Sequence, residues 1–475
     1  MVSDGTKIGG PNGSAYNDKR LSYFGRLNYD FKETYLLNAT FRADGSSTFH
    51  PDNQWGYFPS VSAGWVATNE SFLSNSKIMS FFKLRASWGQ VGNQNAGAYQ
   101  YLAPIQTKTT NYTFGNEEGV LTPGAYQYRL SNPALKWETS EQTNIGFDAR
   151  FFNNALTVNF DWYEKTNKDW LILPPILATA GADAAFINGG NVVNTGVELA
   201  LNYQQSIGDF NFNIAANGAY NKNEVGEIPT ADGIVHGQTN QLYNNAPEFY
   251  RAQDGLPLGY FWGLKTGGVF QNQQQVTDYG IQPNAAPGDI IYQDISGNGS
   301  IGDEDKVMIG DPNPDLTYGI SISANYKALD FSVAANGVVG NQIVQSYRDQ
   351  SGAYGNYTTA ILNRWHGEGS SNTIPRVTED NRNFTQFSDL YIQDGDFLRL
   401  SNITIGLDLA KLKQSKSFFA SEFRVYVSVL NLYTFTKYNG MDPEIGFGTD
   451  NFASSIDVGY YPRPRTIMMG LNVKL

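Results

Sequence analysis

Three absences narrow the functions that this sequence can encode. The chain of 475 residues contains no cysteine, which excludes disulfides, zinc–thiolate sites and thiol nucleophiles. Its three histidines, His50, His236 and His366, lie far apart, so a histidine-based catalytic or metal cluster is not expected. Although 41% of the residues are hydrophobic, no stretch approaches the run of about 20 apolar residues that a transmembrane helix needs.

Basic charge is also scarce. The net charge is −12, and no basic stripe interrupts the sequence, so a nucleic-acid partner is not expected. Met1 is not followed by a basic and then apolar segment, which predicts that an exported form of this chain would be a fragment or a processed piece. No nucleophile, general base or metal constellation indicates an enzyme.

A regular alternation of apolar and polar residues is the strongest feature that is present. From residue 196 to residue 203, Val197, Leu199, Leu201 and Tyr203 alternate with Gly196, Glu198, Ala200 and Asn202. A period of two indicates a β-strand with one apolar and one polar face. The pattern recurs at about the ten-residue length of a membrane-spanning strand, which predicts an all-β, antiparallel transmembrane barrel with a wet lumen.

The alternation predicts thirteen barrel strands. They lie near 21–31, 34–44, 56–67, 81–90, 138–151, 154–168, 193–205, 208–222, 315–327, 329–339, 397–409, 422–431 and 463–475. Tight turns alternate with long connections, and outer-membrane barrels have short periplasmic turns and long outer loops. We therefore expect residues 1–20 to be the remnant of an extracellular loop, and 223–314 to be an extracellular excursion with a small β insertion.

Several longer segments are similar to one protein family. They are residues 21–29 (LSYFGRLNY), 42–47 (RADGSS), 55–60 (WGYFPS), 135–146 (LKWETSEQTNIG), 397–404 (FLRLSNIT), 431–438 (NLYTFTKY) and 461–466 (YPRPRT). Together they resemble the SusC/RagA family of TonB-dependent outer-membrane transporters. The resemblance runs from about residue 21 to the end of the sequence.

The resemblance implies a barrel of about 22 strands whose lumen is plugged by an N-terminal domain. It implies a location in the outer membrane of a Gram-negative bacterium, in contact with lipid. It further implies a SusD-like surface lipoprotein as lid, energy supplied by the TonB complex, and uptake of oligosaccharides or peptides. On this reading residues 21–475 form the C-terminal part of the barrel, about 13 strands, without the plug domain or the segment that contacts TonB.

One acidic loop has the spacing of a calcium-binding loop. Calcium prefers six to eight oxygen ligands, and a twelve-residue loop supplies them from fixed positions. The corresponding residues here are Asp294, Ser296, Asn298, the carbonyl of Ser300, and Asp305. The predicted affinity is weak, because only two carboxylates are direct ligands. An outer turn rich in Asp, Asn and Gly that holds no metal is the open alternative.

A soluble calcium-binding β-sandwich or glycan-binding protein is the alternative from another class, because sandwich strands also alternate. The ten-residue apolar faces and the alternating connection lengths favour the barrel. The aromatic residues expected in outer loops could stack on sugar rings or pack the loops together. They are Tyr243, Phe249, Tyr250, Tyr260, Trp262, Tyr354, Tyr357 and Trp365.

Overall fold

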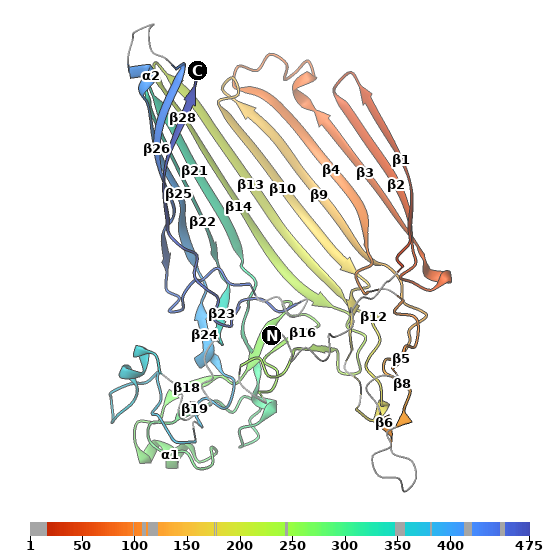
Figure 1. Ribbon diagram of the computed structural model, residues 1–475, viewed down its shortest axis with the longest axis vertical. Helices are drawn as coiled ribbons and strands as arrows, with labels where there is room; N and C mark the ends of the chain where they lie inside the picture. Colours follow the sequence, from red (N-terminus) through yellow and green to blue (C-terminus); the bar gives the residue numbers. More distant parts are fainter. Residues whose placement is uncertain are drawn as a thin grey trace, which may run out of the picture.

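The fold is dominated by one large antiparallel sheet. The computed structural model describes residues 17–97, 99–106, 111–112, 122–174, 176, 178–242, 246–346, 357–380, 382–412, 420–446 and 452–475. Thirteen long strands follow one another across the sheet in chain order (Figure 1). They are β1 (Arg20–Phe31), β2 (Tyr35–Ser46), β3 (Trp55–Val66), β4 (Met79–Asn93), β9 (Glu138–Phe151), β10 (Leu156–Lys168), β13 (Asn191–Ile207), β14 (Phe210–Gly226), β21 (Leu316–Tyr326), β22 (Leu329–Val339), β25 (Phe397–Asp408), β26 (Glu422–Thr436) and β28 (Thr466–Lys474).

All thirteen coincide with strands predicted from the alternation, so the predicted barrel wall is confirmed. The last strand begins at Thr466 rather than near residue 463. Pro462 and Pro464 precede it, and proline has no N–H group to donate to a neighbouring strand. Of the expected loop remnant at residues 1–20, residues 1–16 lie outside the described part of the chain.

The connections contain shorter elements. The strands are β5 (Ile105–Gln106), β6 (Asn111–Tyr112), β7 (Thr122–Pro123), β8 (Tyr126–Gln127), β11 (Leu171–Ile172), β12 (Ile187–Asn188), β15 (Ile234–His236), β16 (Tyr250–Gln253), β17 (Tyr260–Gly263), β18 (Thr266–Val269), β19 (Ile290–Tyr292), β20 (Val307–Gly310), β23 (Gln342–Gln345), β24 (Ile392–Asp394) and β27 (Ile456–Asp457). The α-helices are α1 (Gln273–Tyr279) and α2 (Leu409–Leu412), and the 3-10 helices are η1 (Pro51–Asn53), η2 (Ala67–Asn69), η3 (Ala178–Ala180), η4 (Asp303–Asp305), η5 (Thr359–Asn363) and η6 (Asp389–Tyr391). Neither α-helix in the described part of the chain is long and apolar enough to cross a bilayer.

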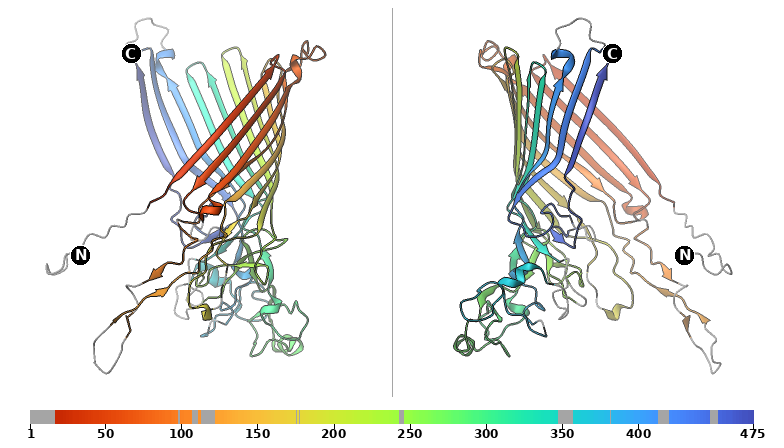
Figure 2. Two further views of the ribbon diagram at one scale, coloured as in Figure 1. Left: turned by 90° about the vertical axis from the view of Figure 1, so that its right-hand side faces the viewer. Right: turned by 60° about the vertical axis from the view of Figure 1, so that its left-hand side comes forward.

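The sheet curves into a trough with two open edges. Within the described residues β1 pairs only with β2, and β28 pairs only with β26. Figure 2 shows β1 and β28 at the two rims of the curved wall. Thirteen strands therefore form a continuous segment of a barrel wall rather than a closed ring.

One face of this wall is apolar from edge to edge. A single row of cross-strand partners contains Phe31, Tyr35, Trp65, Leu84, Phe147, Phe160, Leu199, Gly218, Tyr318, Gly337, Leu398 and Phe435. Leu199 in this row is 43% exposed. The buried hydrophobic clusters of the described residues lie instead in the long connections and at strand ends. The apolar faces are thus not packed against a second sheet, in contrast to the sandwich alternative.

Aromatic side chains gather near both ends of the apolar face. Near the short turns they are Phe31, Tyr35, Trp65, Phe151, Tyr203, Phe210 and Tyr326. Near the long connections they are Tyr23, Trp55, Tyr57, Trp162, Tyr220, Tyr433 and Phe435. Transmembrane barrels carry such aromatic girdles on either side of an apolar band about 25 Å tall.

The two ends of the wall differ in their connections. The short turns at Lys32–Glu33, Phe152–Asn154, Gly208 and Lys327 adopt positive φ angles, as tight hairpins require, and lie together at the top of Figure 1. The long connections lie at the opposite end. The connection between β14 and β21 contains a four-stranded sheet of β15, β16, β17 and β20.

Four long connections share one hydrophobic core. It combines Trp170 and Ile172 from β10–β13, Phe249 and Phe261 from β14–β21, Val344 and Phe387 from β22–β25, and Phe452 and Ile456 from β26–β28. The rings of Phe249 and Phe387 have centroids 4.7 Å apart. The connections therefore pack as one body beyond the end of the wall, which we call the loop body.

Candidate functional site

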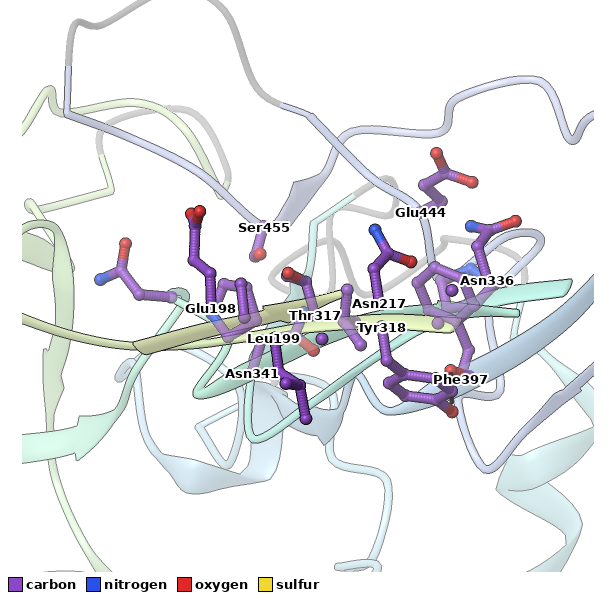
Figure 3. A pocket seen from close by; sticks show the side chains of 18 of the residues that line it. Glu198, Leu199, Asn217, Thr317, Tyr318, Asn336, Asn341, Phe397, Glu444 and Ser455 are labelled. Atoms are coloured by element: carbon purple, nitrogen blue, oxygen red, sulfur yellow. Dashed lines mark hydrogen bonds between the residues drawn. The ribbon is translucent and has the colours of Figure 1, made fainter. Parts of the chain in front are cut away.

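The polar face of the wall opens into a cavity beneath the loop body. Glu198, Asn217 and Asn336 rise from this face toward the last long connection, which carries Glu444 and Ser455 (Figure 3). Tyr318 lies on the opposite face in the same view. The cavity between wall and connection has a volume of about 880 Å³. It is large enough for a small oligomeric solute, and its position marks a candidate passage along the wall.

Ion pairs flank this cavity on the polar face. The Arg85 guanidinium donates to Asp161 at 2.9 Å and to Asp148 at 3.0 Å, and thereby joins β4, β9 and β10. Nearer the short turns, Arg424 of β26 donates to Asp330 of β22 at 2.7 Å. The charges on these two parts of the wall are therefore paired within the wall, and they tie neighbouring strands together.

The last long connection is fastened to the wall by a buried arginine. Arg399 of β25 is 2% exposed; its guanidinium pairs with Asp442 and lies 3.1 Å from Glu444. Its Nε donates to Thr434 at 3.1 Å. Arg463 contacts Glu444 at 2.7 Å. Both carboxylates are thus held by guanidinium groups and serve as structural anchors of the last long connection.

Several aromatic residues of the loop body pack in its interior. Phe249 and Tyr250 are fully buried, and burial raises the pKa of the Tyr260 hydroxyl to about 12. Trp262 contacts two cations, with the Arg251 guanidinium 3.1 Å and the Lys306 ammonium 4.7 Å from its ring centroid. These four rings hold the loop body together rather than presenting free faces to sugars. Tyr243 and Tyr354 lie outside the described residues.

A histidine joins two parts of the same connection. His236 of β15 contacts Glu248 at 2.8 Å through Nδ1 and Asp232 at 2.8 Å through Nε2. Burial alone would lower the pKa of His236, but the hydrogen bonds to the two carboxylates outweigh burial and raise it above the ordinary value. The contacts therefore stabilise the charged imidazolium, and they hold β15 beside the segment that precedes β16.

The predicted calcium loop connects β19 to η4. Asp294 accepts from the backbone N–H groups of Gly297 and Gly299 at 2.7 and 2.9 Å. Asp305 is fully buried and accepts from the backbone N–H of Ser296 at 2.9 Å. Hydrogen bonds from the backbone of Ser296 and Gly302 lower the pKa of Asp305. The two carboxylates therefore meet around Ser296.

The remaining predicted ligands of this loop lie differently. The Asn298 side-chain oxygen accepts from the backbone N–H and the hydroxyl of Ser300 at 2.8 Å each. Its amide nitrogen donates to Glu304 at 2.6 Å. Asn298 and Ser300 are thus brought together with each other rather than with Asp294 and Asp305. Gly297 and Gly299 have φ angles of +71° and +80°, which only glycine adopts without strain.

Comparisons with known proteins agree with this architecture. A family described as "TonB dependent receptor-like, beta-barrel" matches residues 2–432. TonB-dependent receptor P3 of Formosa agariphila is 32% identical over 464 residues, which is 96% of this chain and 45% of that protein. TonB-dependent receptor SusC of Bacteroides thetaiotaomicron is 31% identical over 96% of this chain and 43% of its own length. The chain thus spans less than half the length of these relatives.

A solved structure has the same fold. The RagAB peptide importer in its "closed-closed" state superposes with a TM-score of 0.78 and 25% identity, and the match covers 96% of this chain and 47% of that one. The thirteen-stranded wall, its apolar face and the match over most of the chain all agree with the resemblance found in the sequence. The chain belongs to the TonB-dependent receptor-like β-barrel family and is of the SusC/RagA type.

Proposed function

We propose that this chain forms the C-terminal part of the barrel of an outer-membrane, TonB-dependent importer that takes up oligosaccharides or peptides together with a SusD-like lipoprotein. The observation that carries this proposal is the two-faced wall. One face is apolar and exposed across thirteen strands, and the other is polar and lines a cavity of about 880 Å³. Lipid on one side and water on the other account for both faces.

The two ends of the wall support an orientation in the membrane. Short turns lie on the periplasmic side of outer-membrane barrels, and long loops lie outside the cell. The loop body would then stand on the cell surface above the cavity, where a lid protein could cover it. The matched relatives are named as receptors and a peptide importer rather than as enzymes.

Uptake measurements in the native host test this proposal. We expect disruption of the gene that encodes the intact protein to abolish uptake of one class of oligosaccharide or peptide, and a protonophore to have the same effect on the wild type. A surface lipoprotein should copurify with the tagged, membrane-extracted protein. Recovery of the protein in the soluble fraction, or unchanged uptake of every solute after disruption, would contradict the proposal.

We also propose that the loop 294–305 binds calcium weakly, with a dissociation constant of about 10⁻⁴–10⁻³ M as in extracellular modules. Two carboxylates support this proposal. Asp305 is fully buried, and Asp294 turns into the loop, where it accepts from the Gly297 backbone N–H. A chelator should then increase protease cleavage within 288–310 of the intact protein, and added calcium should reverse the effect. Asp294→Asn should show the increase without chelator.

The matched control for the calcium loop is Asp303→Asn. Asp303 pairs with Lys306 at 2.6 Å and is not one of the predicted ligands. Its substitution should leave the chelator response intact. Equal cleavage of the wild type with chelator and with calcium would identify the loop as a metal-free turn.

A further inference from the structure

A stripe of uncharged polar side chains runs along the polar face of the wall, from the long connections to the short turns. One register row across five adjacent strands reads Asn159, Ala200, Asn217, Gly319 and Asn336. All five residues line the cavity at the long-connection end, and all five also line a second hollow of about 450 Å³. The row therefore lies where the cavity and the second hollow meet along the wall.

The stripe continues to the short turns. The second hollow adds Asn202, Ser321 and Ser401 to the shared row. A third hollow of about 690 Å³ at the short turns is lined by Asn154, Gln204, Ser206, Asn211, Asn213, Ser323 and Asn325, among others. Amide and hydroxyl groups thus follow β13, β14 and β21 from one end of the wall to the other. We call these polar residues, with Asn159, Asn217 and Asn336, the neutral stripe.

Many groups of the neutral stripe are available to a solute. The side chains of Asn202, Asn217 and Asn336 make no hydrogen bond to other residues in the described part of the chain. The Asn217 carboxamide leans over Gly319, where an added Cβ would lie 2.6 Å from its oxygen. Glycine at position 319 therefore leaves room for this amide, and a carboxamide can both donate to and accept from a hydroxyl group.

Charge is distributed so that the stripe stays neutral. The second and third hollows have no charged residue in their described lining. The cavity at the long connections has acidic residues, among them Glu198 and Glu444, but no Lys, Arg or His in its described lining. Arg85 and Arg424, on either side of the stripe, are held by wall carboxylates. Within the described linings of these three spaces an anionic solute would meet repulsion from Glu198 and no Lys, Arg or His.

We propose that the neutral stripe is the surface along which the transported solute moves, and that it selects uncharged, hydroxyl-rich molecules, that is, neutral oligosaccharides. This inference rests on the proposed function and narrows its solute. Single hydrogen bonds to amides are weak, and a row of weak equivalent sites lets a solute enter and leave, as conduction requires. A peptide fits less well, because its terminal carboxylate would find no partner.

The backbone of the wall gives a second reason to prefer oligosaccharides. Extended peptides are commonly bound by adding a strand to an open sheet edge, which supplies main-chain hydrogen bonds. Strands β10, β13, β14, β21 and β22 are each paired on both sides, so their backbone groups are already used. Only side-chain amides and hydroxyls remain for a solute, and these match sugar hydroxyl groups.

Competitive uptake by the intact transporter in its native host tests the inference. Cells would receive a mixture of oligosaccharides from starch and xylan, acidic oligosaccharides from pectin, and peptides from a casein digest. Depletion of each species would be followed by mass spectrometry. We expect depletion that depends on the transporter to be confined to neutral oligosaccharides. The double variant Asn202→Leu/Asn217→Leu should slow this depletion about tenfold, because two solute hydrogen bonds are lost.

The matched control is Asn28→Leu, which changes an asparagine on the polar face of β1, outside the neutral stripe. It should alter uptake less than twofold, and both variants should reach the outer membrane in wild-type amounts. Transporter-dependent depletion of peptides or acidic oligosaccharides would overturn the inference and leave the importer function standing. Equal rates for the double variant and the control would also overturn it. No depletion of any species by a correctly inserted transporter would contradict the importer function itself.

Discussion

Leu199→Arg is expected to destabilise the assembled barrel by roughly 2–4 kcal/mol, because it places a charge against lipid near the middle of the apolar face. Leu199 is 43% exposed and pairs with Phe160 on one side and Gly218 on the other. Neither of these two cross-strand neighbours has a polar side chain that could receive the guanidinium. The measurement is the amount of heat-modifiable, folded transporter in the outer-membrane fraction, together with its unfolding midpoint in denaturant.

The control places the same charge one residue earlier. Glu198 projects from the polar face in Figure 3, so Glu198→Arg and the milder Glu198→Gln should leave assembly near the wild-type level. A period of two means that these neighbouring positions differ only in the face they occupy. If arginine at 198 and at 199 impaired assembly equally, the assignment of lipid and water to the two faces would be wrong.

The wall could be predicted from sequence because its determinants are local. The alternation from Val197 to Tyr203 fixes both the strand and the face that each side chain occupies, whatever its partners are. The turn at Lys32–Glu33 is equally local, and both residues adopt the positive φ angles of a tight hairpin. Thirteen stretches of this kind were enough to predict the wall, because each strand of the wall pairs with the next long strand along the chain.

The loop body could not be predicted in the same way. Trp170 and Phe452 pack edge to face with centroids 5.9 Å apart, although 282 residues separate them in sequence. The sequence around Phe249 and Tyr250 does not distinguish an exposed ring that could bind sugar from a buried ring that packs in a shared core. Arg399 and Asp442 likewise come from different elements, and only the fold shows that they meet.

The acidic loop at 294–305 lies between these cases. Its glycines at 297 and 299 and Asp294, which accepts from their backbone N–H groups, are local features, and the structure places them as a tight turn. Whether the oxygens converge on an ion depends on side-chain rotations, and here Asn298 turns toward Ser300. A wet lumen was predicted from the polar faces of the strands, but the neutral stripe itself needed the register, because only strand pairing places asparagines of different strands in one row.

Arg399→Ala is expected to cost about 3–5 kcal/mol, the usual effect of removing one partner from a buried ion pair. The arginine is 2% exposed and pairs with Asp442 and Glu444, so its loss removes the counter-charge of Asp442, whose side chain is 11% exposed, and leaves Glu444 with Arg463 alone. The segment 442–446 should detach from the wall to hydrate them. The measurements are the unfolding midpoint of the intact transporter and protease cleavage between residues 437 and 446.

Two further variants distinguish the cost of leaving a carboxylate unpaired from the cost of removing a side chain. The triple variant Arg399→Met/Asp442→Asn/Glu444→Gln removes all three charges together, and it should recover most of the stability, because neutral groups cost less to bury than unpaired ions. Lys437→Ala removes an exposed cation 3.9 Å from Asp394, and it should cost less than about 1 kcal/mol. If Arg399→Ala shifted the unfolding midpoint as little as Lys437→Ala does, Arg399 would not be the residue that holds the last connection against the wall.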